Sequence, residues 1–117
     1  MGKIYKSENH IVLLQMIEIY RPDVTDWMQY QITRRNILTL HHIRKACEGG
    51  FTCVDNGAIL TRKAHQVLNM VEAIDGVLYD EWNDLFALIN QGKQPPCKEY
   101  VREGKKLKNY TQRIIYK

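Results

Sequence analysis

The middle of the chain places two β-prone segments and a helical segment in a fixed order. The apolar, branched run from about residue 36 to 43 predicts a strand, and three glycines with an Asp-Asn-Gly run mark the loop after it. A short apolar strand then starts at Ala58, and from Thr61 apolar residues recur at helical spacing. The order of strand, loop, strand and helix predicts a β-hairpin followed directly by a helix.

Helices are expected on both sides of this unit. Residues 10–20 predict one that stops at Pro22, residues 22–31 a short one that starts near Asp23 or Thr25, and residues 79–92 one that Asp80 caps. We expect Gly76 to end the helix that starts near Thr61. The residues expected to face inward are, in chain order, Ile11, Leu14 and Ile17 or Glu18; Trp27 and Tyr30; Ala64, Val67, Leu68, Val71 and Ile74; and Leu85, Leu88 and Ile89.

Length and composition fit a single soluble globular domain. The chain has 117 residues, of which 44% are hydrophobic and 26% are charged. No apolar stretch reaches the roughly 20 residues that a membrane span needs, and the N-terminus lacks the pattern of a signal peptide, so we expect a cytoplasmic protein. Three cysteines without a CxxC pair argue against a disulfide framework and a four-cysteine zinc ribbon.

Positive charge is concentrated at the C-terminal end. Up to Gly92 there are nine Lys or Arg residues against eleven Asp or Glu, whereas from Lys93 there are eight against two. We therefore divide the chain into a domain at 1–92 and a basic tail at 93–117. A basic segment that also carries tyrosines is typical of nucleic-acid contacts, although a solvated end that only adds solubility explains the charge equally well.

The candidate chemistry lies in the hairpin and its helix. His41 and His42 end the first strand, and His65 and Asn69 are four residues apart on one helical face. One metal ion would take His41 and His65, with Asn69 or water completing its shell, and His42 would stay free to accept a proton from water. Because neighbouring strand residues point to opposite faces, a bulge or an early strand end near Leu40 is needed to bring His41 and His42 together.

Each of these residues also has a plainer interpretation. His65 alone is more often a hydrogen-bonded histidine than a ligand, and Asn56 before Gly57 suits the left-handed backbone of a tight turn. Arg62 and Lys63 at the start of the helix are either phosphate contacts or solvated charges. Taken together, the order of these residues along a strand, a loop, a second strand and a helix favours a functional site.

These segments resemble the HNH endonucleases. LTLHHI, a Gly-Gly loop, DNGAIL and AHQVLN look like the ββα-metal (His-Me finger) motif of that family, over about Leu38 to Val71. The nine-residue interval from Asn56 to His65 is similar to that in colicin-type nuclease domains and in the HNH domains of CRISPR effectors. The resemblance implies an α+β, mostly helical fold in which flanking helices pack around a central ββα-metal motif at about 36–75.

The resemblance also implies a metal-dependent endonuclease that hydrolyses DNA phosphodiester bonds. His42 would be the general base, His41 and His65 would bind one divalent cation, Asn56 would brace the loop and orient the base, and Asn69 would be a third ligand or a bystander. The zinc-holding CxxC pairs of many relatives are absent, and His41 replaces the Asp of many members. Since imidazole suits softer metals, we expect Mn²⁺, Ni²⁺ or Zn²⁺ to bind more tightly than Mg²⁺.

The expected partner is double-stranded DNA, with RNA left open as a substrate, and no membrane. A homodimer is also left open, and by analogy small nucleases of this kind are bacterial or phage proteins. The alternative class is a non-catalytic nucleic-acid-binding or protein-interaction module on the same scaffold, but the joint presence of His42 and both ligand candidates favours catalysis. The candidate nucleic-acid contacts are Arg44, Lys45, Arg62, Lys63, Lys105, Lys106 and Lys108.

Overall fold

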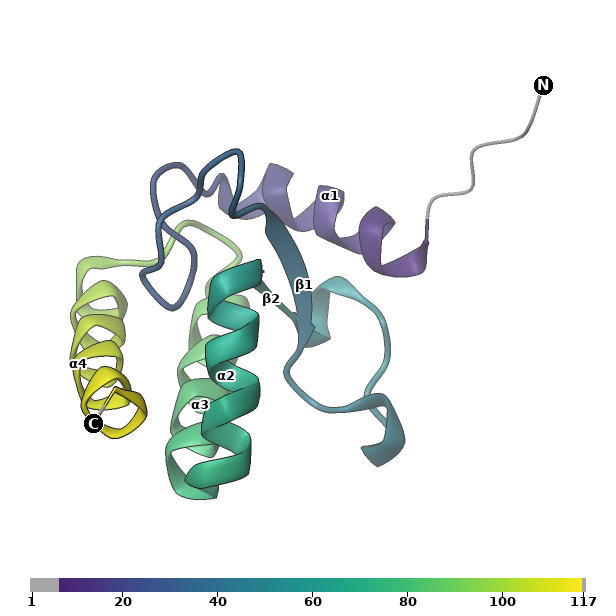
Figure 1. The fold of residues 1–117 in the computed structure, drawn as a ribbon. Coiled ribbons are helices and arrows are strands. Elements are labelled where there is room, and N and C mark those ends of the chain that lie inside the picture. The colour runs from purple at the N-terminus through teal and green to yellow at the C-terminus, as the bar shows by residue number, and fades with distance from the viewer. Residues whose placement is uncertain (1–6, 117) are drawn as a thin grey trace.

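A computed structural model describes residues 7–116 and has an α+β, mostly helical fold (Figure 1). The described chain contains four α-helices and one two-stranded antiparallel sheet, which confirms the fold class at this level. The elements are α1 (Glu8–Tyr20), β1 (Leu38–His42), β2 (Gly57–Thr61), α2 (Arg62–Ile74), α3 (Gly76–Gly92) and α4 (Lys98–Ile115), with 3₁₀ turns η1 (Ala46–Glu48) and η2 (Val54–Asn56) between the strands. Residues 1–6 lie outside the described part of the chain. They include most of the N-terminal stretch that lacks the pattern of a signal peptide.

The hairpin is regular to its end. β1 pairs one-to-one with β2, with Leu38 opposite Thr61 and His42 opposite Gly57. The N–H group of Ile43 donates a further hydrogen bond to the Asn56 carbonyl at 2.9 Å. The expected bulge and the expected early strand end near Leu40 are therefore both wrong, and His42 is the last residue of the strand.

Helix α2 follows β2 without an intervening residue, as the sequence predicts. Thr61 caps the helix, because its hydroxyl accepts a hydrogen bond from the Ala64 N–H group at 3.1 Å. The predicted inward face is confirmed for Ala64, Val67, Leu68 and Val71. Ile74 is wrong: it is 58% exposed, because it is the last residue of α2 and lies beyond the core.

The helix expected at residues 22–31 does not form. Thr25 pairs with Gln31 in an isolated β-bridge, and Asp26 is buried between them in the loop. One carboxylate oxygen of Asp26 accepts from the N–H groups of Met28 and Tyr30, and the other accepts from Thr61 N–H at 2.8 Å. These bonds give the backbone an alternative to helix, while Trp27 and Tyr30 are still buried as expected.

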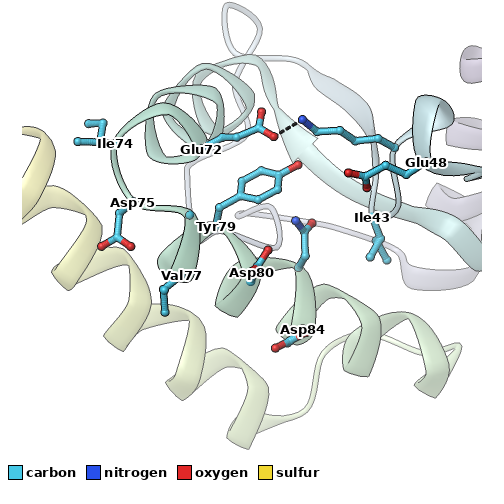
Figure 2. Close-up of a pocket in the computed structure, with 12 residues that line it drawn as sticks. Ile43, Glu48, Glu72, Ile74, Asp75, Val77, Tyr79, Asp80 and Asp84 are labelled. Carbon is cyan, nitrogen blue, oxygen red and sulfur yellow. Dashed lines mark ion pairs between the residues drawn. The ribbon is translucent and has the colours of Figure 1, made fainter.

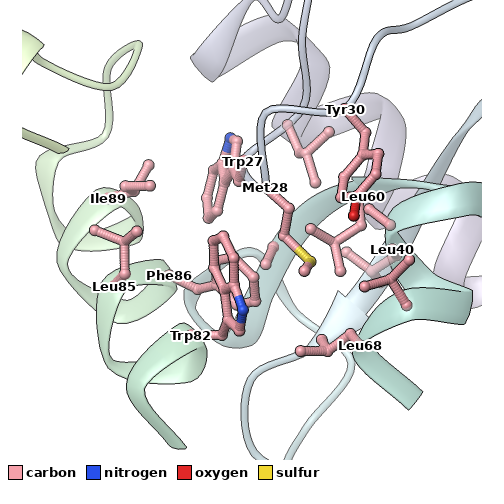
Figure 3. Packing of buried hydrophobic residues seen from close by; sticks show 14 of the residues in the cluster. Trp27, Met28, Tyr30, Leu40, Leu60, Leu68, Trp82, Leu85, Phe86 and Ile89 are labelled. Carbon is pink, nitrogen blue, oxygen red and sulfur yellow. The ribbon is translucent and has the colours of Figure 1, made fainter. Parts of the chain in front are cut away.

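Helix α1 packs on the hairpin with a different face from the expected one. Its buried residues are Val12, Leu13, Met16 and Tyr20, whereas Ile11 and Leu14 are exposed. Apolar residues surround this helix, so periodicity alone does not define which face is buried. The core that it joins contains Trp27, Met28, Tyr30, Leu40, Leu60, Leu68, Trp82, Leu85, Phe86 and Ile89 (Figure 3).

A single residue, Asp75, separates α2 from α3. Its carboxylate accepts from the Leu78 N–H group at 3.0 Å and caps α3. The predicted end of the preceding helix beside Gly76 is confirmed, because α2 ends at Ile74, although Gly76 is the first residue of α3 and not a left-handed cap. The predicted cap at Asp80 is wrong, since Asp75 caps α3 instead. Leu85 and Ile89 face inward as predicted, but Leu88 is exposed.

The basic segment forms helix α4 and packs against α3 (Figure 1). The Trp82 indole N–H group donates to the Thr111 hydroxyl at 3.0 Å, and both side chains are buried. Gly104 is buried beside Gln29 and the Trp27 carbonyl. Residues 98–115 are therefore part of the packed structure. No helix in the described part of the chain is long and apolar enough to cross a bilayer.

Candidate active site

Four of the predicted catalytic and metal-binding residues lie around one cavity. His41 and His42 at the end of β1, with His65 and Asn69 on α2, line a shallow space of about 190 Å³. Both histidines of β1 line the cavity even though the strand is regular to His42. The remaining lining residues are Lys45, Ala46, Glu72 and Tyr79.

His41 is buried between the hairpin, α2 and α3, with 7% of its surface exposed. Its Nε2 atom lies 2.8 Å from Oδ1 of Asn83. An amide oxygen only accepts hydrogen bonds, so Nε2 carries the proton and Nδ1 keeps its lone pair. Burial, opposed by the hydrogen bond to Asn83, lowers the pKa of His41 to about 4, which leaves the ring neutral at pH 7.

His65 is held in the opposite tautomer. Its Nδ1 atom lies 2.8 Å from the Thr39 hydroxyl, and that hydroxyl donates its only proton to the Leu60 carbonyl. The hydroxyl must therefore accept a hydrogen bond from His65 Nδ1, which leaves the lone pair on Nε2. Burial lowers the pKa of His65 as well. Both imidazoles are thus neutral and each has one unprotonated nitrogen.

The distance between the two rings suits a shared cation. The ring centroids of His41 and His65 are 5.5 Å apart and the ring planes are 80° to each other. Two imidazoles that bind one tetrahedral metal at the usual metal–nitrogen distance have ring centres about 5 Å apart. Within residues 7–116 no three His, Cys, Asp or Glu side chains group closely enough to hold a metal, so the amide of Asn69 and water would have to complete the shell.

His42 is held from the loop side. Its Nε2 atom lies 2.9 Å from the hydroxyl of Thr52, which comes from the loop between the strands. This contact orients the ring and uses one ring nitrogen. The second nitrogen, Nδ1, remains available for a water molecule or a substrate.

Asn56 does not line the cavity but ties the loop together. Its side-chain amide accepts from the Arg44 N–H group and donates to the carbonyls of Arg44 and Phe51, at 2.8 to 2.9 Å. Gly50 lies so close to the Arg44 carbonyl that a side chain there would collide with it. The loop that carries Thr52 therefore has a fixed shape.

The candidate cationic contacts fall into two groups. Arg44, Lys45, Arg62 and Lys63 belong to the loop and to the start of α2, whereas Lys105, Lys106 and Lys108 are on α4, which contributes nothing to the cavity lining. Four of these cations already have partners in the fold. Lys45 pairs with Glu72, Lys106 pairs with Glu103, and Lys63 lies 5.9 Å from the centre of the Tyr116 ring. Lys108 donates to the Gln29 carbonyl and lies 4.4 Å from the centre of the Tyr30 ring. Arg44, Arg62 and Lys105 are exposed.

A larger acidic cavity adjoins the site. It has a volume of about 870 Å³ and shares Lys45, Glu72 and Tyr79 with the site (Figure 2). Carboxylates of Glu48, Asp75, Asp80 and Asp84 line the rest of it. Because these charges repel phosphate, a nucleic acid is expected to avoid this cavity.

Four residues of this arrangement escaped the sequence analysis. Glu72 follows His65 by seven residues, and Thr39 precedes His41 by two on the same strand face, so helical and strand spacing would have indicated both. Thr52 and Asn83 carry no such signal, since they reach His42 and His41 through the loop and through α3.

Comparison of the chain with protein-family models, curated proteins and solved structures finds no match. A function therefore has to be argued from the geometry of the site.

Proposed function

We propose that this chain is a metal-dependent endonuclease of the HNH type that hydrolyses DNA phosphodiester bonds on a ββα-metal element formed by β1, β2 and α2. The observation that carries the proposal is the placement of two histidines in one cavity, with contacts to Thr39 and Asn83 from which one free ring nitrogen is assigned to each. His41 and His65 each keep one unprotonated nitrogen, their rings are 5.5 Å apart, and both line the cavity that also holds His42.

Nδ1 of His41 and Nε2 of His65 would hold one divalent cation, with the Asn69 amide as a further ligand. When bound, that cation would neutralise charge on the phosphate and on the departing 3′-oxygen. The donor set is rich in nitrogen and poor in carboxylate, which favours Zn²⁺, Ni²⁺ or Mn²⁺ over Mg²⁺ for tight binding.

His42 would be the general base. In the tautomer whose Nε2–H group donates to the Thr52 hydroxyl, Nδ1 would take a proton from the water that attacks phosphorus, and the ring would later return this proton to solvent. Asn56 would act as a positioning residue, because it fixes the loop that carries Thr52.

The direct test is plasmid nicking in Mg²⁺, Mn²⁺, Ni²⁺ and Zn²⁺, with an RNA of matched length as a second substrate. His42→Ala should reduce the rate at least about 100-fold, the usual contribution of a general base. His10→Ala is the matched control, since His10 is an exposed histidine on α1, and it should cleave like the wild type. DNA that is retarded in a gel but cut under none of these metals would contradict the proposal.

A second candidate is a non-catalytic nucleic-acid-binding module. The observation in its favour is that Asn83 and Thr39 already satisfy His41 and His65, as buried structural histidines require. The two candidates differ in metal binding. The module predicts that His41→Ala and His65→Ala lose stability only, whereas the nuclease predicts that they also lose a 1:1 metal site.

A further inference from the structure

Phe51 is the most exposed large hydrophobic residue among those described, with 78% of its surface exposed. It lies in the loop between β1 and β2, directly between Gly50 and Thr52. An exposed phenyl ring leaves a large apolar surface in water, whereas most aromatic side chains in proteins are buried. The fold itself gives no reason for a ring at this position.

The backbone holds Phe51 in a fixed place. Its carbonyl accepts a hydrogen bond from the Asn56 side chain at 2.9 Å, and the residue before it, Gly50, is packed against the Arg44 carbonyl. Because the backbone is already ordered, only the rotation of the side chain is lost when a ligand covers the ring.

Phe51 is also close to the proposed chemistry. The next residue, Thr52, contacts His42 at 2.9 Å, and adjacent Cα atoms are about 3.8 Å apart. Summed through the Thr52 side chain, the Cα spacing and the length of a phenylalanine side chain, the ring centre lies no more than about 13 Å from Nε2 of the proposed general base. A nucleotide near a phosphate held at His42 can reach the ring over that distance.

The loop also offers a cation for the backbone of that nucleotide. Arg44 is exposed, and its guanidinium group packs against Gly49, two residues before Phe51. A guanidinium for a phosphate beside an aromatic ring for a base is the usual composition of sites for unpaired nucleotides. The acidic cavity that adjoins the site disfavours DNA within it.

We propose that Phe51 is a base-stacking residue that takes an unpaired nucleobase beside the scissile phosphate. The inference rests on the proposed nuclease function and narrows its substrate to DNA in which one base near the cut is unpaired or easily unstacked. Every base has a π-face, so the contact selects DNA structure and not sequence.

The test is DNA binding by the full chain in EDTA, where metal-dependent cleavage cannot occur. The probes are two duplexes that carry 2-aminopurine either unpaired or fully paired, read by anisotropy and by quenching of the 2-aminopurine fluorescence. Wild type should prefer and quench the unpaired probe. Phe51→Ala should weaken that binding at least about fivefold and abolish the quenching, as expected for the loss of one aromatic–base stack.

Two further variants make the result specific. Phe51→Trp should keep both the preference and the quenching, because an indole stacks as well as a phenyl ring. Val24→Ala removes another exposed apolar side chain, 60% exposed and outside the site, and should behave like the wild type. Equal affinity of Phe51→Ala and wild type for the unpaired probe would overturn the proposal.

The outcome separates this inference from the proposed function. If Phe51-dependent quenching is seen but no metal supports cleavage, Phe51 stacks on an unpaired base, whereas the nuclease and the place of that base beside a scissile phosphate are wrong. If wild type cleaves DNA and Phe51→Ala has the same substrate preference, the nuclease stands and the stacking role is wrong.

Discussion

The hydroxyl of Thr39 lies 2.8 Å from Nδ1 of His65 and equally far from the carbonyl of Leu60, so it determines which nitrogen of the histidine carries a proton. Thr39→Val removes the hydroxyl that accepts from His65 Nδ1 and keeps the shape of the side chain. We expect metal affinity to fall about 10-fold, the lower end of the loss seen when a partner of a metal-binding histidine is removed. Titration calorimetry with Zn²⁺ measures this change. Thr39→Ser should retain wild-type affinity, and a normal affinity in Thr39→Val would refute the assigned tautomer.

Asn83 is the corresponding partner of His41, and Asn83→Asp should act in the opposite direction. A carboxylate that accepts from Nε2 stabilises the charged ring and makes Nδ1 more basic. The pKa of His41 should rise above its value of about 4, and Zn²⁺ should bind more tightly. Titration of the histidine by NMR gives the pKa. A pKa that stays unchanged would show that the contact between these residues does not persist in solution.

The depressed pKa of His41 makes the metal-free protein sensitive to acid. The pKa is about 4 when folded and about 6.5 when unfolded, so between these values the unfolded chain binds more protons. The contribution of His41 to stability is therefore fully present above pH 6.5 and is lost as the pH falls towards 4, by about 3 kcal/mol in total. Urea unfolding in EDTA at pH 7, 5 and 4 measures it. The pH dependence should be smaller in His41→Gln, and an equal dependence in both proteins would contradict the assignment.

The buried carboxylate of Asp26 connects the loop at residues 21–37 to the start of α2. It accepts three N–H groups, from Met28, Tyr30 and Thr61, although burial raises its pKa. In Asp26→Asn one oxygen becomes an amide that cannot accept, so at least one of these donors loses its partner. We expect the free energy of unfolding to fall by about 1–3 kcal/mol. Chemical denaturation measures this loss, and an unchanged midpoint would show that the three bonds do not hold the loop.

The order of the central elements could be predicted because local signals agree there. The branched run before His41, the glycine loop and the stripe from Ala64 to Val71 each specify one state, and the hairpin and α2 formed at the expected places. The helix expected at residues 22–31 failed because a single buried side chain, Asp26, takes up the backbone N–H groups of the loop. Nothing in the local pattern indicates that Asp26 is buried, since the bond to Thr61 spans 35 residues.

The candidate site, like the fold, could be predicted from the sequence only in part. The grouping of His41, His42, His65 and Asn69 in one cavity follows from the order of elements and from helical spacing. The residues that fix the tautomers and hold His42, such as Asn83 on α3, come from distant parts of the chain and could not be predicted. The role of these side chains in catalysis stays a prediction.

Metal titration of the histidine variants tests the central claim most directly. Wild type should bind one equivalent of Zn²⁺ or Ni²⁺, and His41→Ala and His65→Ala should each lose at least about 100-fold in affinity, since each removes a direct ligand. His42→Ala and the exposed control His10→Ala should both bind the metal normally. Of these two variants, only His42→Ala should lose cleavage. Binding that is absent in the wild type, or that is equally strong in His65→Ala, would contradict the assignment of one shared cation to β1 and α2.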